Sequence, residues 1–300
     1  QALAEPTSAL RDFAPDFVLL ALDAPHLVGN GASLDASLDL IKACWAMAQA
    51  LGATVIQQTV LATQLPLLGN NEHRLDSSPA ARVAALNAAF RAAATAAGVQ
   101  LLSLDTLAQE GGLSAWHDRA LWCHSKQEVH PRMSPEYGDH VARIVAAVRG
   151  LSSKCLVLDL DNTCWGGVIG DDGLNGIVLG QGSAAGEAHL ALQRYAKALS
   201  ERGCILAVCS KNDDTVAREP FLKHTEMILR LPDIACFVAN WQDKASNLRE
   251  IATTLNIGID SLVFVDDNPF ERELVRRELP MVAVPELPED PALYAECLAS

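Results

Sequence analysis

The stretch from Lys154 to Gly173, KCLVLDLDNTCWGGVIGDDG, constrains the fold of this chain more than any other part. It begins with an apolar run over residues 155–158, which is typical of a strand buried on both faces of a parallel sheet. Two carboxylates, Asp159 and Asp161, follow directly. Ligands of open α/β sheets bind at the carboxyl ends of the strands, so we expect a site here. Such carboxylates can hold a hard cation and offer a nucleophile.

The remainder of the second half repeats this arrangement of a buried strand followed by polar residues. The pattern predicts strands at 204–209, 236–238, 262–265 and 281–284, and helices at 187–202, 214–222, 244–256, 269–279 and 291–298. The glycine-rich residues 165–173 favour a short hairpin. Polar residues near the predicted strand ends are Ser210, Lys211, Asn212, Lys244, Asp266 and Asp267.

The first half reads as a second α/β layer. Strands are predicted at 17–22, 54–59 and 99–104, and helices at 34–51, 79–97 and 135–148. The alternation of strand and helix indicates a parallel sheet. We predict a loop rich in histidine and tryptophan at 116–140. We therefore expect two domains, 1–150 and 151–300.

Charge and cysteine content limit the classes of function. The 300 residues carry a formal net charge of −14, which argues against binding to nucleic acids or anionic membranes. A phosphorylated substrate remains compatible, because a bound divalent cation reverses the local field. The eight cysteines form no CxxC pair, and no apolar run is long enough to span a membrane, so we expect a cytoplasmic protein with reduced thiols. The start of the chain has no basic-then-apolar leader pattern, and we expect a segment excised from a longer protein.

The ordered set of strand-end groups resembles the haloacid dehalogenase-like (HAD) superfamily over about residues 154–285. The resemblance implies a Rossmann-like parallel sheet with helices on both faces. It also implies phosphoryl transfer with Asp159 as the nucleophile and Asp161 as the general acid and base. Implied phosphate-binding residues are Thr163, Ser210, Lys211, Asn212 and Lys244, and implied Mg²⁺ ligands are Asp159, Asp161 (through its backbone carbonyl), Asp266 and Asp267.

Three segments are most similar to the FkbH-like subfamily (group IIIC) of that superfamily: 159–173, 210–213 and 264–276. This resemblance implies a glyceryltransferase/phosphatase of polyketide pathways. Such an enzyme takes 1,3-bisphosphoglycerate, removes phosphate, holds the glyceryl group as a thioester on Cys164 and loads it onto the phosphopantetheine arm of an acyl carrier protein. The alternatives are a Mg²⁺-dependent phosphatase of a small phosphorylated metabolite and a non-catalytic scaffold module.

Cys164 can also be interpreted without the family. A thiol beside a bound cation and Lys244 lies in a field that favours the reactive thiolate, which can attack the carbonyl of an acyl phosphate. The competing interpretation is a small buried cysteine that only packs. We expect the functional interpretation, because Cys164 lies in the turn after the strand, whereas four other cysteines lie in or beside strands.

Two further features are candidate sites. The order of elements in 1–150 resembles an SGNH hydrolase domain, but Gln127 stands where the Asp of that family's Asp-x-x-His motif is expected, three residues before His130. We therefore expect a degenerate domain with a packing or partner-contact role.

Arg272, Arg276 and Arg277 could form a basic patch for an acidic carrier protein, or they could pair with neighbouring glutamates on one helix.

Overall fold

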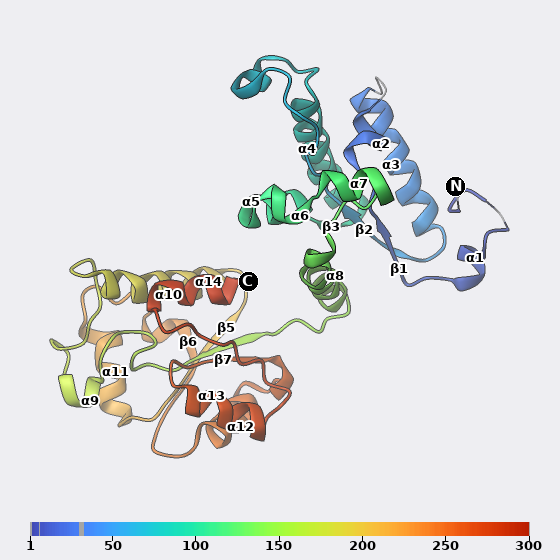
Figure 1. The fold of residues 1–300 in the computed structure, drawn as a ribbon. Helices are drawn as coiled ribbons and strands as arrows, with labels where there is room; N and C mark the ends of the chain where they lie inside the picture. The colour runs from blue at the N-terminus through green and yellow to red at the C-terminus, as the bar shows by residue number, and fades with distance from the viewer. Residues whose placement is uncertain (1, 6, 30–32, 300) are drawn as a thin grey trace. The chain divides into compact units, whose positions relative to one another are not determined.

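The computed structural model describes residues 2–5, 7–29 and 33–299, and the chain divides into two compact units, 1–150 and 151–300. Each unit contains its own sheet, and every strand pair in both sheets is parallel (Figure 1). The predicted α/β class is therefore confirmed. None of the helices in the part of the chain that is described combines the length and hydropathy that a membrane crossing requires.

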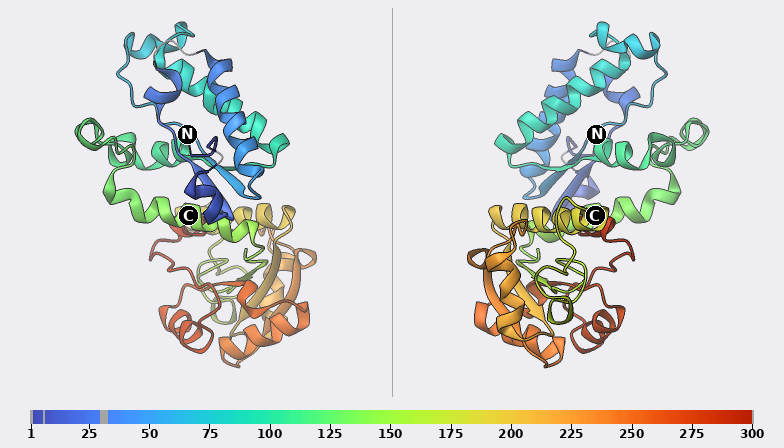
Figure 2. Two further views of the ribbon diagram at one scale, coloured as in Figure 1. Left: turned by 90° about the vertical axis from the view of Figure 1, so that its right-hand side faces the viewer. Right: turned by 90° about the vertical axis from the view of Figure 1, so that its left-hand side faces the viewer.

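The sheet of the first unit has the order β1-β2-β3, with β1 at Phe17–Leu20, β2 at Thr54–Gln58 and β3 at Gln100–Leu102. The long helices α3 (Leu34–Gln49) and α4 (Pro79–Ala97) lie side by side over one face (Figures 1 and 2). Ser33 and Ser78 cap them, because each hydroxyl accepts a hydrogen bond from a backbone N–H of the first turn. The remaining helices of this unit are α1 (Ala9–Phe13), α2 (Ala24–Val28), α5 (Leu104–Gly111), α6 (Leu113–Trp116), α7 (Arg119–Ser125) and α8 (Ser134–Val148).

The predicted loop at 116–140 is wrong in part, because it contains α7, whereas the predicted helix at 135–148 is present as α8. Asp118 begins α7 by accepting hydrogen bonds from the backbone N–H groups of Ala120 and Leu121. Trp116 is completely buried and anchors the segment before it. Short capped helices of this kind lack the long apolar periodicity on which the sequence interpretation depended.

The sheet of the second unit has the order β6-β5-β4-β7. Its strands are β4 (Cys155–Leu158), β5 (Ile205–Ser210), β6 (Ile234–Ala239) and β7 (Leu262–Val265). The chain leaves β4 toward β5 and β6 and then returns to the other side of β4 as β7. The carboxyl ends of the strands on either side of such a reversal border the crevice in which open α/β sheets bind ligands.

Helices cover both faces of this second sheet, as Figures 1 and 2 show for α10 on one side and α12 and α13 on the other. The side chains of β4 alternate between two hydrophobic cores: Leu156 and Leu158 face one, and Cys155 and Val157 face the other. This arrangement explains the continuous apolar run of a strand buried on both faces. The helices of the unit are α9 (Ile169–Asp172), α10 (Ala184–Glu201), α11 (Asp214–Lys223), α12 (Lys244–Leu255), α13 (Pro269–Glu278) and α14 (Tyr294–Ala299).

Two predicted elements of the second unit are wrong. Residues 165–173 do not form a hairpin: Gly166 makes an antiparallel bridge with Val178, and the residues that follow turn into α9. The predicted strand at 281–284 is reduced to one bridge, in which Ala283 exchanges two backbone hydrogen bonds with β7. Pro280 and Pro285 flank this segment, and proline cannot donate the hydrogen bonds that would lengthen the ladder.

Candidate active site

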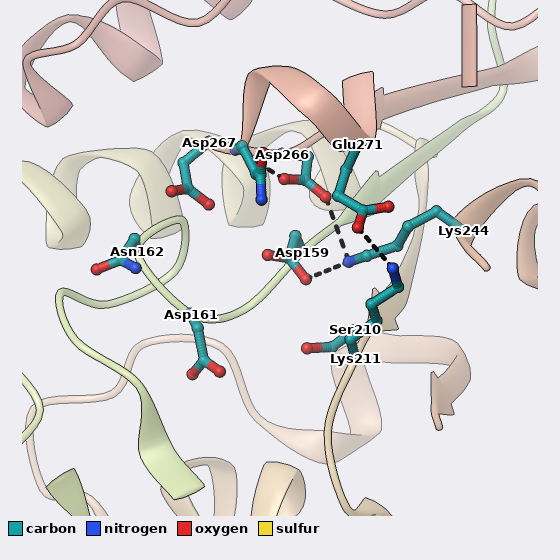
Figure 3. A pocket seen from close by; sticks show the side chains of 10 residues that line it. Asp159, Asp161, Asn162, Ser210, Lys211, Lys244, Asp266, Asp267 and Glu271 are labelled. Carbon is teal, nitrogen blue, oxygen red and sulfur yellow. Dashed lines mark hydrogen bonds and ion pairs between the residues drawn. The ribbon is translucent and has the colours of Figure 1, made fainter. Parts of the chain in front are cut away.

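Five of the predicted site residues meet at the carboxyl edge of the second sheet. Asp159 follows β4, Ser210 ends β5, Lys244 begins α12, and Asp266 and Asp267 follow β7. They line a cavity of about 170 Å³ (Figure 3). Two more predicted residues, Asp161 and Lys211, also line the cavity, together with Asn162, Asn268 and Glu271, which were not predicted as site residues.

The acidic part of the cavity consists of Asp159, Asp266 and Asp267, which bring carboxylate oxygens within 4.8 Å of one another. Burial, and after it the charge of Asp159, raises the pKa of Asp266 to about 7 and that of Asp267 to about 6. Oδ2 of Asp266 accepts no hydrogen bond from any described residue, although Lys244 Nζ lies 3.3 Å away. A set of oxygen ligands with unrelieved negative charge fits a hard divalent cation such as Mg²⁺.

Lys244 is the positive centre of the site, with only 2% of its surface exposed. Its Nζ donates hydrogen bonds to Asp159 Oδ1 at 2.5 Å and to the carbonyl oxygen of Cys209 at 2.7 Å. Burial alone lowers the pKa of a lysine, but the charges of Asp159 and Asp266 outweigh burial and raise the pKa above its ordinary value. Lys244 therefore stays charged and holds the Asp159 carboxylate in one orientation.

Asp161 occupies a different environment from the other carboxylates. Figure 3 shows its side chain pointing away from those of Asp266 and Asp267. Its Oδ1 accepts hydrogen bonds from Trp165 Nε1 and the backbone N–H of Ile169, both at 3.0 Å, and its Oδ2 accepts one from Asn212 at 2.7 Å. Burial raises the pKa of Asp161 despite these donors, so its protonated form is favoured more than that of an exposed aspartate.

Two residues expected to bind phosphate have another role. Thr163 is completely buried, and its hydroxyl pairs with Asp267, accepting from the backbone N–H at 3.1 Å. Asn212 is also buried and donates to Asp161. Neither lines the cavity, so we correct their role from phosphate contact to positioning of Asp267 and Asp161.

Cys164 does not lie in the environment expected of a nucleophile. Its side chain is 0% exposed and does not line the cavity, and its Sγ donates a hydrogen bond to the carbonyl oxygen of Asp159 at 3.1 Å. Burial, followed by the charges of Asp159 and Asp161, raises the pKa of the thiol well above its ordinary value. The charges that act on the thiol are those of Asp159 and Asp161, and both oppose the thiolate that the sequence analysis expected.

Sequence analysis missed two residues of α10, Gln193 and His189, that hold the turn after β4 in place. Gln193 of α10 is completely buried, and its Nε2 donates to the carbonyl oxygen of Cys164 at 2.8 Å. Its Oε1 accepts from the backbone N–H groups of Ile228 and Leu229. His189, one helical turn earlier, places Nδ1 2.8 Å from the carbonyl oxygen of Thr163. Polar residues four positions apart on the apolar face of a helix were the signal that could have identified them.

The three arginines of α13 do not form a free basic patch. Arg272 is buried and donates to the carbonyl oxygens of Asp266 and Asp267, so it fixes the loop that carries them. Arg272 and Arg276 also pair with Glu286, and Arg277 pairs with Glu278. Of the expected pairs with glutamates of the same helix, only that of Arg277 with Glu278 is present, because Arg272 is buried and Glu286 lies outside the helix.

The fold and the cavity define this unit as a HAD-like domain: a parallel sheet with carboxylates after two adjacent strands, a serine ending a third and a buried lysine that begins a helix. Comparison with solved structures agrees. The N-terminal part of the protein BF1531 from Bacteroides fragilis, which contains a phosphatase domain and is complexed with Mg, superposes with a TM-score of 0.92 at 37% identity. The match covers 99% of this chain and 81% of that one. The chain therefore belongs to the same family as the BF1531 protein, within the HAD superfamily.

Other comparisons contribute less. An uncharacterised protein from Corynebacterium glutamicum matches at 11% identity over 46% of this chain and 86% of its own, but its TM-score of 0.31 is too low to carry an argument. No family model and no curated protein sequence matches the chain.

Proposed function

We propose that residues 151–300 form a Mg²⁺-dependent phosphatase that acts on a small phosphorylated metabolite. The observation that carries the proposal is the group of Asp159, Asp266 and Asp267 around the buried Lys244. The phosphatase domain of the BF1531 protein, complexed with Mg, supports both the activity and the metal. When bound, Mg²⁺ neutralises the carboxylates and the phosphoryl oxygens that meet in the cavity.

The side chains divide the proposed reaction between them. An oxygen of Asp159 attacks phosphorus, and the bond between phosphorus and the ester oxygen breaks as the aspartyl phosphate forms. Asp161, whose pKa is raised by burial, gives a proton to the leaving alkoxide. Water then attacks the aspartyl phosphate and returns a proton to Asp161, releasing phosphate. Lys244 and Ser210 donate hydrogen bonds to charge that develops on the phosphoryl group.

Removal of the metal tests this proposal. We expect EDTA to lower phosphate release from a small phosphomonoester by more than about 100-fold, because three close carboxylates then repel the dianion. Excess Mg²⁺ restores the rate. Phosphate release can be followed colorimetrically, and thermal unfolding under the same conditions shows whether the protein stays folded. Full activity in EDTA would contradict the proposal.

A finer hypothesis is that of an FkbH-like glyceryltransferase/phosphatase of a polyketide synthase, with 1,3-bisphosphoglycerate as substrate and an acyl carrier protein as partner. Its support is the position of Cys164 in the turn of the site, with Sγ 3.1 Å from the carbonyl oxygen of Asp159. The complete burial of this thiol opposes it, since acylation requires the turn to open. The structure thus favours the plain phosphatase over the transferase.

Intact-protein mass spectrometry after incubation with 1,3-bisphosphoglycerate separates the two functions. We expect phosphate release without a glyceryl adduct, because a buried, protonated thiol is a poor nucleophile. An adduct that persists in Cys209→Ala, a matched variant of another buried cysteine, and disappears in Cys164→Ala would establish the transferase instead.

For residues 1–150 we propose a packing or partner-contact role rather than SGNH-type catalysis. Gln127 replaces the expected aspartate, and His130 Nδ1 accepts a hydrogen bond from the backbone N–H of Arg132 at 3.1 Å. The histidine is therefore used as a cap of the short helical turn that follows it.

A further inference from the structure

Asn162 is a neutral residue of the cavity to which the proposed mechanism gives no role. It follows Asp161 in the turn after β4, is exposed and lines the cavity. Its Oδ1 accepts a hydrogen bond from the backbone N–H of Gly167 at 2.9 Å, and its own backbone N–H donates to the carbonyl oxygen of Gly167 at 3.3 Å. The carboxamide is therefore held in one orientation before any substrate binds.

This orientation leaves the amide nitrogen of Asn162 as a donor. Because only the oxygen of a carboxamide can accept from Gly167, the nitrogen lies on the opposite arm of the group. Figure 3 shows this nitrogen on the side of Asp159, with the oxygen turned away. No described residue accepts a hydrogen bond from Nδ2. Since the residue is exposed, a molecule bound in the cavity can reach this nitrogen.

The place of Asn162 in the turn shows which part of the substrate meets the donor. In the proposed reaction Asp161 protonates the ester oxygen as it leaves, so the leaving group extends past Asp161. Asn162 is the next residue, and Figure 3 shows it on the same side of the cavity as Asp161 and Asp267, with Lys211 and Lys244 across from it. The nitrogen is therefore placed to meet the leaving group, whereas the two lysines are placed to meet the phosphoryl group.

The charge on this side of the cavity shows which acceptor fits. Asp161 and Asp267 share the side with Asn162, whereas the positive charge of Lys211 lies across the cavity and is paired with Glu271 at 2.6 Å. An anionic acceptor beside Asn162 would be repelled by the carboxylates. A hydroxyl is neutral, and its oxygen accepts a hydrogen bond from an N–H group. The donor therefore fits a hydroxyl of the leaving group.

We infer that Asn162 determines specificity for the leaving group by donating a hydrogen bond from Nδ2 to a hydroxyl oxygen of the substrate, so that the enzyme prefers phosphomonoesters of small polyols. The hydrogen bond from Gly167 holds the carboxamide in place, so the donor needs no reordering when the substrate binds. This inference rests on the proposed phosphatase function.

Two substrates of equal charge and chain length test the inference: sn-glycerol 3-phosphate, whose leaving group carries two hydroxyls, and propyl phosphate, whose leaving group carries none. The measurement is the ratio of their kcat/KM values with Mg²⁺ present, and we expect the wild-type protein to prefer glycerol 3-phosphate. Asn162→Gly should lower the ratio by about 2- to 10-fold, the effect of one neutral hydrogen bond. Glycine adopts the φ of 54° found at Asn162 without strain, so the turn should be preserved.

A matched control exists at the end of α12. Asn256 is exposed, has a φ of 52° and does not line the cavity, so Asn256→Gly should leave the ratio unchanged. If Asn162→Gly releases phosphate too slowly to measure, Asn162→Ala replaces it, because its Cβ limits the backbone more than glycine does while the amide is still absent. The ratio should fall by the same factor.

The outcomes separate this inference from the function on which it rests. A ratio that is the same in the wild-type protein and in the Asn162 variant would overturn the inference and leave the phosphatase standing. A wild-type protein without preference for glycerol 3-phosphate would also overturn it. Phosphate release from neither substrate by the wild-type protein would refute the phosphatase, and this inference with it.

Discussion

Phosphate release by Asp159→Asn is expected to be at least about 10³-fold slower than that of the wild-type protein, because an amide cannot attack phosphorus as a carboxylate does. The substitution preserves the shape of the side chain and its place beside Lys244, so the fold should survive. Single-turnover measurement of phosphate release with saturating Mg²⁺ isolates the chemical step from product release.

A matched control exists in the same segment. Asp171 is exposed in α9 and does not line the cavity, so Asp171→Asn should retain activity within about twofold. Trapping supports the assignment further: acid quenching of the wild-type reaction should yield a phosphorylated protein, and Asp159→Asn should yield none. Substantial activity in Asp159→Asn would exclude Asp159 as the nucleophile.

Lys244→Met should reduce both activity and stability. Its Nζ is buried between Asp159 and Asp266, and methionine of similar length leaves these carboxylates without their cation. Removing one partner from a buried charged group costs about 3–5 kcal/mol in the free energy of unfolding. Activity should fall by about 10²-fold or more, because the developing phosphoryl charge loses a donor.

The stability loss should depend on pH in a defined direction. Asp266 in the folded wild-type protein has a pKa of about 7, above that of an unfolded aspartate, so its contribution favours the folded state at low pH and is lost as pH rises through about 7. Without Lys244 the pKa rises further, so the deficit of Lys244→Met should be larger at pH 8 than at pH 5.5.

Urea unfolding at the two pH values in EDTA measures this deficit, and added Mg²⁺ should reduce it, because the cation binds only the folded site. Lys223→Met, which breaks an exposed helix pair with Glu219, should cost less than about 1 kcal/mol and show no such pH dependence. A deficit of equal size at both pH values would contradict the electrostatic account of Lys244.

Hydrophobic periodicity and the polar residues after each strand were sufficient to predict the strands of the second sheet and several residues of the site. The apolar run of β4 and the polar residues after β5 and β7 placed Asp159, Ser210 and Asp266 at one edge of one sheet. Local pattern could not predict which way a side chain turns within a loop. Thr163 and Cys164 follow the cavity-lining Asn162 directly in sequence, yet both side chains are completely buried, Cys164 in the hydrophobic core and Thr163 against the backbone of Asp267.

The residues that the sequence analysis missed were missed for a related reason, because their roles depend on contacts between distant parts of the chain. Glu271 and Gln193 acquire their roles from partners 60 and 29 residues away in the chain, Lys211 and Cys164 respectively. A glutamate near a helix N-terminus is ordinary, and the four-residue spacing of His189 and Gln193 indicates a polar pair on one helix face without indicating which chain segment it contacts. Tertiary pairing of this kind is determined only when the sheet is assembled.

The amide of Gln193 has a consequence for how the molecule opens. Because it bonds at once to the carbonyl oxygen of Cys164 and to the backbone of Ile228 and Leu229, three chain segments share one buried junction. The turn that follows β4 cannot fray by itself, as most loops do, without breaking the packing of α10. Hydrogen exchange in this turn should therefore report subglobal unfolding of the helix rather than local breathing, and loss of the catalytic geometry should coincide with loss of the domain's cooperative core.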